Sequence, residues 1–186
     1  GGRLSALWRA SETFSLKLSA LFQDTDVEGS SDVNGTLGEL QQSYIRGTGD
    51  FDLKAQAYGA TLTGKLGRAE LTAVSGYSIN EFVGTTDAGH DFDFATQPVF
   101  GDAGNLILDD SKAEKFSQEI RLLMPVGEHV EWLLGAFYTH EDTEWVETLH
   151  AVETDTGVRI DPEWGSISFP STYSEIAAFT DVTFHV

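Results

Sequence analysis

Carboxylates are the most numerous side chains here that could do chemistry, and their spacing decides what they can do. Asp24, Asp26, Glu28 and Gly29 follow the D-x-D-x-E-G order that opens a calcium-binding loop. Such a loop needs oxygen ligands at alternate positions and a bidentate acid at the twelfth. This chain has Gly35 at the twelfth position. We therefore interpret the segment as an ordinary acidic loop, with calcium binding as the alternative.

Two histidines border a second group of acids. His140 and His150 lie on either side of Glu141, Asp142, Glu144 and Glu147. Imidazole and carboxylate groups can bind a metal together, but these side chains do not have the short, fixed spacing of a metal motif. We interpret them as solvated loop residues, and the sequence predicts neither a metal nor a cofactor.

Enzymatic chemistry finds little support in the sequence. Glu175 and Asp181 are six residues apart on a predicted strand, which separates them by roughly 20 Å. Paired glycosidase carboxylates must lie much closer together. The sequence has no nucleophile elbow, P-loop or dinucleotide fingerprint. It also has no cysteine, which excludes disulfides and cysteine metal sites. We expect a protein that is not an enzyme.

The charge of the chain is concentrated in three segments. Residues 24–50, 80–114 and 140–172 together carry the formal net charge of −19, and the rest of the chain is neutral. A chain without a basic surface cannot neutralise phosphates, so we expect no nucleic-acid partner. In the neutral parts, apolar residues alternate with polar ones, which is typical of half-buried strands.

The clearest predicted strand covers residues 14–23. Phe14, Leu16, Leu18, Ala20 and Phe22 alternate with polar residues, so they share one face of a sheet. Eight residue steps extend roughly 26 Å, or about 20 Å of height at a tilt of about 40°. That height is close to the apolar band of an outer-membrane barrel, with the two aromatic ends near the interfaces.

Six more segments show the same alternation, and short and long connections follow each other between them. The further strands are predicted at 3–10, 51–62, 69–79, 115–123, 130–139 and 174–185. Residues 11–13, 63–68 and 124–129 are predicted as short turns, and the three acidic segments as long loops. No helix of useful length is expected, and the longest apolar run, 132–138, is far too short for a membrane helix.

These patterns predict an all-β fold. The expected architecture is an antiparallel meander of about seven strands, part of a large transmembrane β-barrel with short periplasmic turns and long extracellular loops. Charged residues opposite the apolar side would line the lumen of such a barrel. They are Lys17, Glu119, Arg121 and Asp181, together with Lys54, Glu70, Glu175 and the uncharged but polar Gln56. Glu119 and Arg121 are two residues apart on one strand, so we expect them to share a face and to pair with each other or with neighbouring strands.

Aromatic residues within the acidic segments are the candidates for ligand binding. They include Trp145, Trp164, Phe92 and Tyr44, which could hold a ligand at the mouth of the barrel. The alternative is that these rings pack loops against each other.

Residues 115–141 carry a resemblance to a known family. Residues 115–125 read KFSQEIRLLMP, and residues 131–141 read EWLLGAFYTHE. This pair resembles a hairpin of the TonB-dependent outer-membrane receptors, in which an FSQE-R-L-SP strand precedes a W-GAFY strand. The segments at 1–23, 69–78 and 173–186 are similar in style to barrel strands of the same family.

The resemblance implies a function and a set of partners. The family combines a plug domain with a 22-stranded barrel and imports a siderophore-bound metal, cobalamin or a glycan with energy from TonB. Residues 1–186 are expected to form about seven strands and no plug. We therefore expect them to be an internal segment of such a barrel, in the outer membrane of a Gram-negative cell. Its expected partners are outer-membrane lipid, the plug of the same protein, and the TonB complex through a part that lies outside this sequence.

Two other interpretations remain open at this point. The chain could form a complete small outer-membrane barrel, if an eighth strand lies within 80–114. It could also be a soluble extracellular β-protein that binds carbohydrate through its acidic, aromatic loops. The sequence leaves the transported ligand open in every case.

Overall fold

A computed structural model describes residues 1–31, 33–89 and 91–185. These residues form eight strands and one short helix. The elements are β1 (Gly2–Ser11), β2 (Phe14–Val27), β3 (Phe51–Leu66), β4 (Ala69–Gly89), α1 (Asp93–Phe100), β5 (Gly104–Val126), β6 (Val130–Val152), β7 (Arg159–Ser168) and β8 (Ser171–Phe184).

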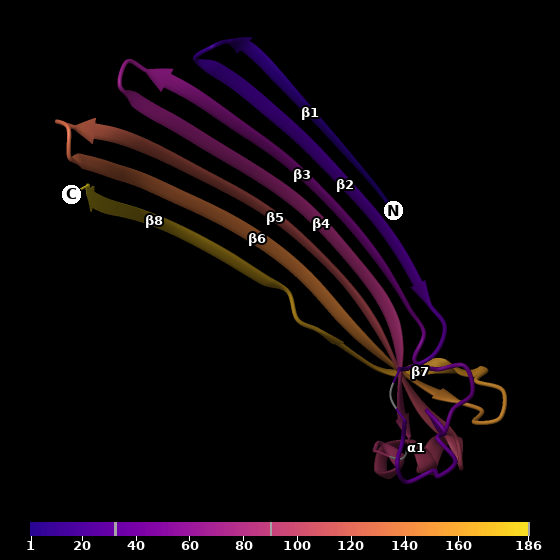
Figure 1. The fold of residues 1–186 in the computed structure, drawn as a ribbon. Coiled ribbons are helices and arrows are strands. Elements are labelled where there is room, and N and C mark those ends of the chain that lie inside the picture. The colour runs from indigo at the N-terminus through magenta and orange to yellow at the C-terminus, as the bar shows by residue number, and fades with distance from the viewer. Residues whose placement is uncertain (32, 90, 186) are drawn as a thin grey trace.

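The strands form a single antiparallel sheet in which neighbours in sequence are neighbours in space (Figure 1). The order runs from β1 to β7, and β8 also pairs with β6. β7 and β8 behave as one interrupted strand beside β6. Ser168 pairs with Val146, Ser171 pairs with Thr143, and the Phe169 amide between them donates to the Trp145 carbonyl at 2.8 Å. Counted this way, the described residues form seven strands, and the predicted all-β antiparallel meander is confirmed.

Short and long connections lie at opposite ends of the sheet, as predicted (Figure 1). Residues 12–13, 67–68 and 127–129 join strands at one end, and the segments 28–50, 90–103 and 153–158 join them at the other. The predicted loop lengths were wrong, however. β4, β5 and β6 have 21, 23 and 23 residues. Most of 80–114 and much of 140–172 is therefore strand, including β7, which was not predicted. The helix α1 within 80–114 was not predicted either.

The strand register assigns every ladder residue to one of two faces, because directly paired residues of an antiparallel ladder project from the same face. We call the face that carries Phe14 the apolar face and the one that carries Lys17 the polar face. The apolar face combines the alternate residues of all seven predicted strands, including Trp8, Leu16, Leu18, Leu62, Leu71, Ile120, Leu122, Leu134, Ala178 and Val182. The same register places Lys54 and Gln56 on the apolar face, so their predicted place opposite it was wrong.

The buried core lies at the end with the long connections. Ile45, Leu106 and Val152 form it, and both Ile45 and Val152 are fully buried. The segment 28–50 is held there because the Ile45 amide donates to the Asp87 carboxylate at 3.1 Å. Gly104 admits this packing, since a Cβ at that position would lie 2.9 Å from Cγ1 of Ile45.

The rest of the sheet is uncovered on its apolar face. Leu4 is 72% exposed and Ile176 is 84% exposed. Among the described residues, no helix combines the length and the apolar character that a membrane crossing would require. The main body of the sheet therefore leaves a broad apolar surface without a partner inside the described chain.

Gly157 provides a test of the packing around the buried core. It has a φ of +70°, and a Cβ there would collide with the Arg46 carbonyl. Gly67 has a φ of +67° and open space around it. We expect Gly67→Ala to lower the free energy of unfolding by about 1 kcal/mol, because only the backbone is strained. Gly157→Ala should cost clearly more, because the backbone of 46 must also move. Urea titration measures both, and equal losses would contradict this packing.

Candidate functional site

A row of aromatic rings crosses the apolar face. Tyr58 pairs with Tyr77, and Tyr77 pairs with Phe116 in the ladder. Phe22 extends the row at one end, with its ring centroid 5.7 Å from that of Tyr58. Tyr138 extends it at the other, 6.3 Å from Phe116. We call these five residues the upper aromatic row, and all five rings are partly exposed.

A second group of aromatic rings lies on the same face near the short turns. Trp8 and Phe14 pack edge to face with ring centroids 6.2 Å apart. Trp132 lies on β6 in the same region, where its indole N–H donates to Thr180 at 2.7 Å, and Phe184 pairs with Val130. We call Trp8, Phe14, Trp132 and Phe184 the lower aromatic row. Tryptophan and tyrosine are favoured where an apolar phase meets water.

The surface between the two rows is mainly aliphatic. Polar groups within it have partners on the sheet itself. The Ser75 hydroxyl donates to the Gln118 amide oxygen, and the Thr180 hydroxyl donates to the Leu133 carbonyl at 3.0 Å. An aliphatic band with two aromatic borders and internally paired polar groups can lie against an apolar phase without leaving these groups unsatisfied.

The apolar face becomes strongly acidic beyond the upper aromatic row. Its ladder residues there include Asp24, Asp26, Asp52, Glu81, Asp110, Glu114, Asp142 and Glu144. Lys112 lies among them, 3.2 Å from Glu114. The hydrogen bond that Lys112 donates to Glu114 raises the pKa of Lys112, so this lysine is charged wherever the acids are charged. The change from aliphatic to ionic side chains occurs on the same strands and the same face.

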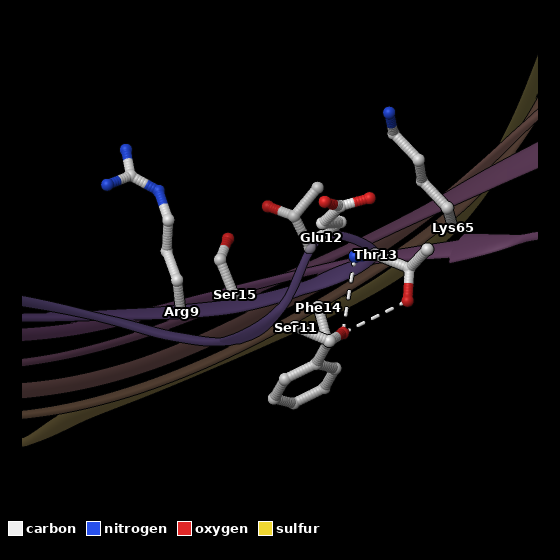
Figure 2. Close-up of a pocket in the computed structure, with 8 residues that line it drawn as sticks. Arg9, Ser11, Glu12, Thr13, Phe14, Ser15 and Lys65 are labelled. Carbon is white, nitrogen blue, oxygen red and sulfur yellow. Dashed lines mark hydrogen bonds between the residues drawn. The ribbon is translucent and has the colours of Figure 1, made fainter.

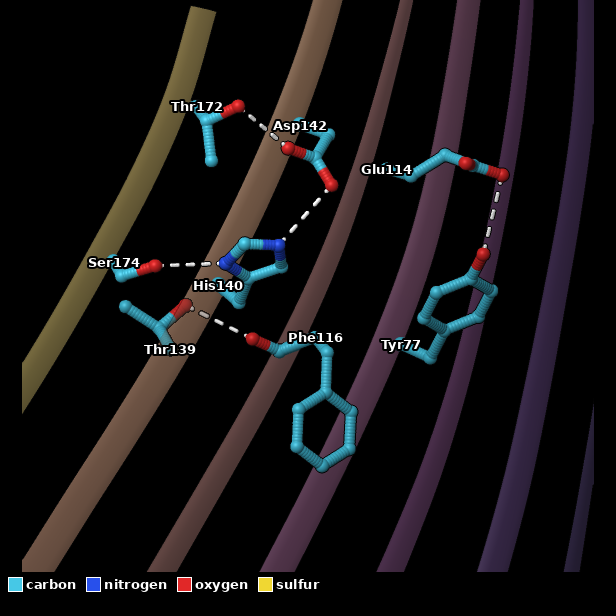
Figure 3. Close-up of polar contacts among 8 residues, drawn as sticks. All are labelled: Tyr77, Glu114, Phe116, Thr139, His140, Asp142, Thr172 and Ser174. Atoms are coloured by element: carbon cyan, nitrogen blue, oxygen red, sulfur yellow. Dashed lines mark hydrogen bonds and ion pairs between the residues drawn. The ribbon is translucent and has the colours of Figure 1, made fainter.

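A polar network in the acidic region joins β6 to the edge strand β8 (Figure 3). His140 uses Nδ1 for a 2.7 Å contact with the Ser174 hydroxyl and Nε2 for a 3.1 Å contact with Asp142. The other oxygen of Asp142 accepts from the Thr172 hydroxyl at 2.8 Å. Asp142 therefore supports both the histidine and β8.

The polar face carries the four predicted wall residues Lys17, Glu119, Arg121 and Asp181. The predicted pairing is confirmed, because the Arg121 guanidinium donates to the Glu119 carboxylate. Lys17 and Asp181 lie on other strands of this face and do not join that pair. Figure 2 shows the two faces near the β1–β2 turn, where Arg9, Ser15 and Lys65 project opposite to Phe14 around a hollow of 200 Å³.

The four predicted ligand-binding aromatics occupy three separate places. Phe92 and Trp164 pack together, with ring centroids 5.4 Å apart. The Tyr44 hydroxyl lies 3.2 Å from that of Thr36 in the segment 28–50. Trp145 lies on the polar face of β6, and its ring centroid is 5.2 Å from that of Phe169. The structure thus brings only Phe92 and Trp164 together, and of the four only Trp145 lies on the polar face of the long strands.

The residues around Trp145 were not predicted from the sequence, because strand pairing brings them together although they are distant in sequence. The Trp145 indole N–H donates to Asp109 at 3.4 Å, and Ser111 is its ladder partner on β5. Phe82 pairs with Ser111 from the other side. The aromatic residues at 51, 82, 145 and 169 were a possible signal, but placing them on one face required the register to be known.

The metal-binding alternatives do not match this geometry. Asp24 and Asp26 lie within the extended strand β2, so the predicted acidic loop there was wrong and the calcium-loop alternative fails with it. His140 and His150 lie ten residues apart on β6, which separates them by about 33 Å. Among the residues that the structure describes, no group of three or more histidine and acidic side chains could hold a metal ion.

Comparison with known proteins does not identify a family. No protein-family model matches this sequence. No curated protein sequence matches it either. The function must therefore be inferred from the faces of the sheet and from the residues on them.

The Asp142 network allows a test with a matched control. Asp142→Ala removes the acceptor of both His140 and Thr172, and each lost hydrogen bond is worth about 1 kcal/mol. We expect amide hydrogen exchange in residues 171–176 to become about fivefold to tenfold faster. Glu144→Ala removes the same charge from the same face two residues further along β6, and it should leave exchange in β8 unchanged. Equal effects of both variants would contradict a specific role for Asp142.

Proposed function

We propose that this chain is a wall segment of a TonB-dependent outer-membrane receptor. In this proposal the apolar face contacts outer-membrane lipid, the short turns are periplasmic and the long connections are extracellular. The whole protein would import a scarce nutrient with energy from TonB, with its plug domain inside the barrel. It would be a transport protein, without an enzymatic activity of its own.

The observation that carries this proposal is the aliphatic band between the two aromatic rows. Large aliphatic side chains there are exposed on β1, β2, β5 and β8, and the bordering aromatic rings are exposed on β3, β4 and β6. Burial of such a side chain is worth about 1.5–3 kcal/mol, so a water-exposed band of this size would be strongly unfavourable. Lipid would cover the band with no further protein layer, and aromatic residues at both borders are typical of barrels in membranes.

The dimensions of the band support the same proposal. Trp132 and Tyr138 are six residue steps apart on β6, and Phe14 and Phe22 are eight steps apart on β2. These distances correspond to about 20–26 Å along the strands. A tilt of about 40° reduces them to roughly 15–20 Å of height. The rings extend this height at both borders, which suits the thin bacterial outer membrane.

Neighbouring strands from outside this sequence would complete the barrel. Within the described residues, β1 pairs only with β2, and the far edge of β8 has no strand beside it. An open edge leaves unpaired backbone groups, which an apolar phase does not tolerate. The open edges therefore favour part of a larger barrel over a complete small one.

Two adjacent alanines on β8 provide the sharpest test of the lipid-facing surface. Ala177 lies on the polar face beside Phe137, and Ala178 lies on the apolar face beside Ala136. The sequence has no cysteine, so single substitutions add the only thiol in this segment. We expect a charged, membrane-impermeant maleimide to label Ala177→Cys in permeabilised outer membranes and to leave Ala178→Cys unlabelled. A fluorophore at 178 should be quenched by nitroxide lipids. Equal labelling of both positions would exclude contact with lipid.

The size of the barrel can be measured in cell fractions. An antibody to this chain should detect an outer-membrane band several times heavier than 20.3 kDa that shifts on boiling. A heat-shifting band near 20 kDa would instead indicate a complete small barrel. Signal only in the soluble fraction would exclude both membrane proposals and leave a soluble carbohydrate-binding protein.

A further inference from the structure

A third aromatic row crosses the opposite, polar face, beyond the level of the upper aromatic row. Phe82 on β4 pairs with Ser111 on β5, and Ser111 pairs with Trp145 on β6. Phe169 continues this row, since its amide donates to the Trp145 carbonyl at 2.8 Å. The residues therefore lie side by side although they are distant in sequence.

The row contains two separate aromatic pairs, and the polar residue Ser111 on β5 lies between them. Phe51 and Phe82 have ring centroids 5.7 Å apart, and Trp145 and Phe169 have ring centroids 5.2 Å apart. Phe82 and Trp145 are two strand spacings apart, which is about 10 Å. Only Ser111 lies between them in the ladder, so the two rings border a gap with a small polar floor.

A carboxylate projects at one end of this gap. Asp109 is two residues from Ser111 on the same face of β5, and it accepts the Trp145 indole hydrogen bond at 3.4 Å. Asp109 also lines a hollow of 250 Å³ beside Phe51 and Phe82. Asp50 is a further carboxylate in the lining of this hollow.

These groups are accessible from solvent. Trp145 is 40% exposed, and Phe169 is 48% exposed. Gly84 helps to keep the Phe82 ring in place, because a Cβ at 84 would lie 2.8 Å from that ring. Aromatic side chains in water-exposed positions, paired and directed toward a polar floor, form a surface on which a flat ligand can lie.

The chemical groups that line the site limit the class of ligand that it could bind. The hollow and the two aromatic pairs include Asp50 and Asp109 but no lysine or arginine. Such a surface repels anions. The negative face of an aromatic ring attracts the weakly positive C–H groups of a sugar ring, and carboxylates and hydroxyls accept or exchange hydrogen bonds with its hydroxyl groups. Few polar groups at fixed positions on an aromatic surface are typical of specific ligand sites.

We propose that Phe82, Asp109, Ser111, Trp145 and Phe169 form a binding site for a neutral oligosaccharide. The site lies on the polar face at the end with the long connections. This inference rests on the proposed function, because that face then borders the hydrated entrance of the barrel. It adds the ligand class that the sequence left open.

The experiment measures saccharide binding by the intact protein as its host makes it, in detergent micelles. The probes are hexasaccharides of α-1,4-glucose, β-1,4-glucose, β-1,4-xylose and β-1,4-mannose, with hexagalacturonate as the anionic comparison. Titration calorimetry gives the affinities, and tryptophan fluorescence reports on the site. We expect at least one neutral hexasaccharide to bind, and hexagalacturonate to bind at least tenfold more weakly.

Variants at the site distinguish a loss of ring stacking on the ligand from a loss of folding. Trp145→Ala should weaken binding at least about tenfold, which is the scale of one lost aromatic contact. Trp145→Phe keeps a ring and should stay within about threefold of the parent protein. Ser111→Phe should block binding, because it fills the gap between Phe82 and Trp145. Phe94→Ala is the matched control, since Phe94 is an exposed aromatic on α1 outside the site.

Several outcomes would overturn the inference. It is wrong if no neutral hexasaccharide binds, if hexagalacturonate binds more tightly, or if Trp145→Ala and Phe94→Ala behave alike. Absence of binding by a protein that still fractionates with the outer membrane would overturn this inference alone. Saccharide binding by a protein found only in the soluble fraction would overturn the proposed function alone.

Discussion

The continuous antiparallel ladder from β1 to β6 and β8 is the constraint on which the other features depend. Each strand pairs with its neighbour in a fixed register, so alternation in one strand is aligned with alternation in the next. A slip of one residue at any pair would exchange the two faces beyond it. The aromatic rows and the aliphatic band exist only because that register is kept across the sheet.

The sheet has two regions that are stabilised in different ways. At the end with the long connections, the chain supplies its own cover, as Ile45 and its hydrogen bond to Asp87 show. Along the rest of the sheet, the backbone bonds are internal but the apolar face has no cover within the described chain. The proposed contact with lipid would supply the missing cover there, whereas the described chain itself buries only a small core.

Sequence patterns predicted the fold where the two faces have different surroundings. The alternation of apolar and polar residues located all seven predicted strands. It disappeared beyond Asn80 and Thr139, because both faces there carry polar groups while the ladder continues. β7 was missed for a different reason: its register against β6 shifts between Leu149 and Ala151. α1 contains Pro98, which weakens any helical pattern. Among site residues, Glu119 and Arg121 are close in sequence and were paired correctly, whereas Asp109 and Phe169 reach Trp145 only through strand pairing.

The alternation of connection lengths has a consequence for how the sheet assembles in time. The three tight turns at 12–13, 67–68 and 127–129 create hairpins whose partners are close in sequence, and such hairpins form within microseconds. The segments 28–50 and 90–103 join one hairpin to the next across longer stretches, and closing a longer loop costs more entropy. Hairpins should therefore form first and dock afterwards as preformed units. The segment 28–50, which carries Ile45, would reach its place on the sheet only after docking. The small core would therefore form in the last step of assembly.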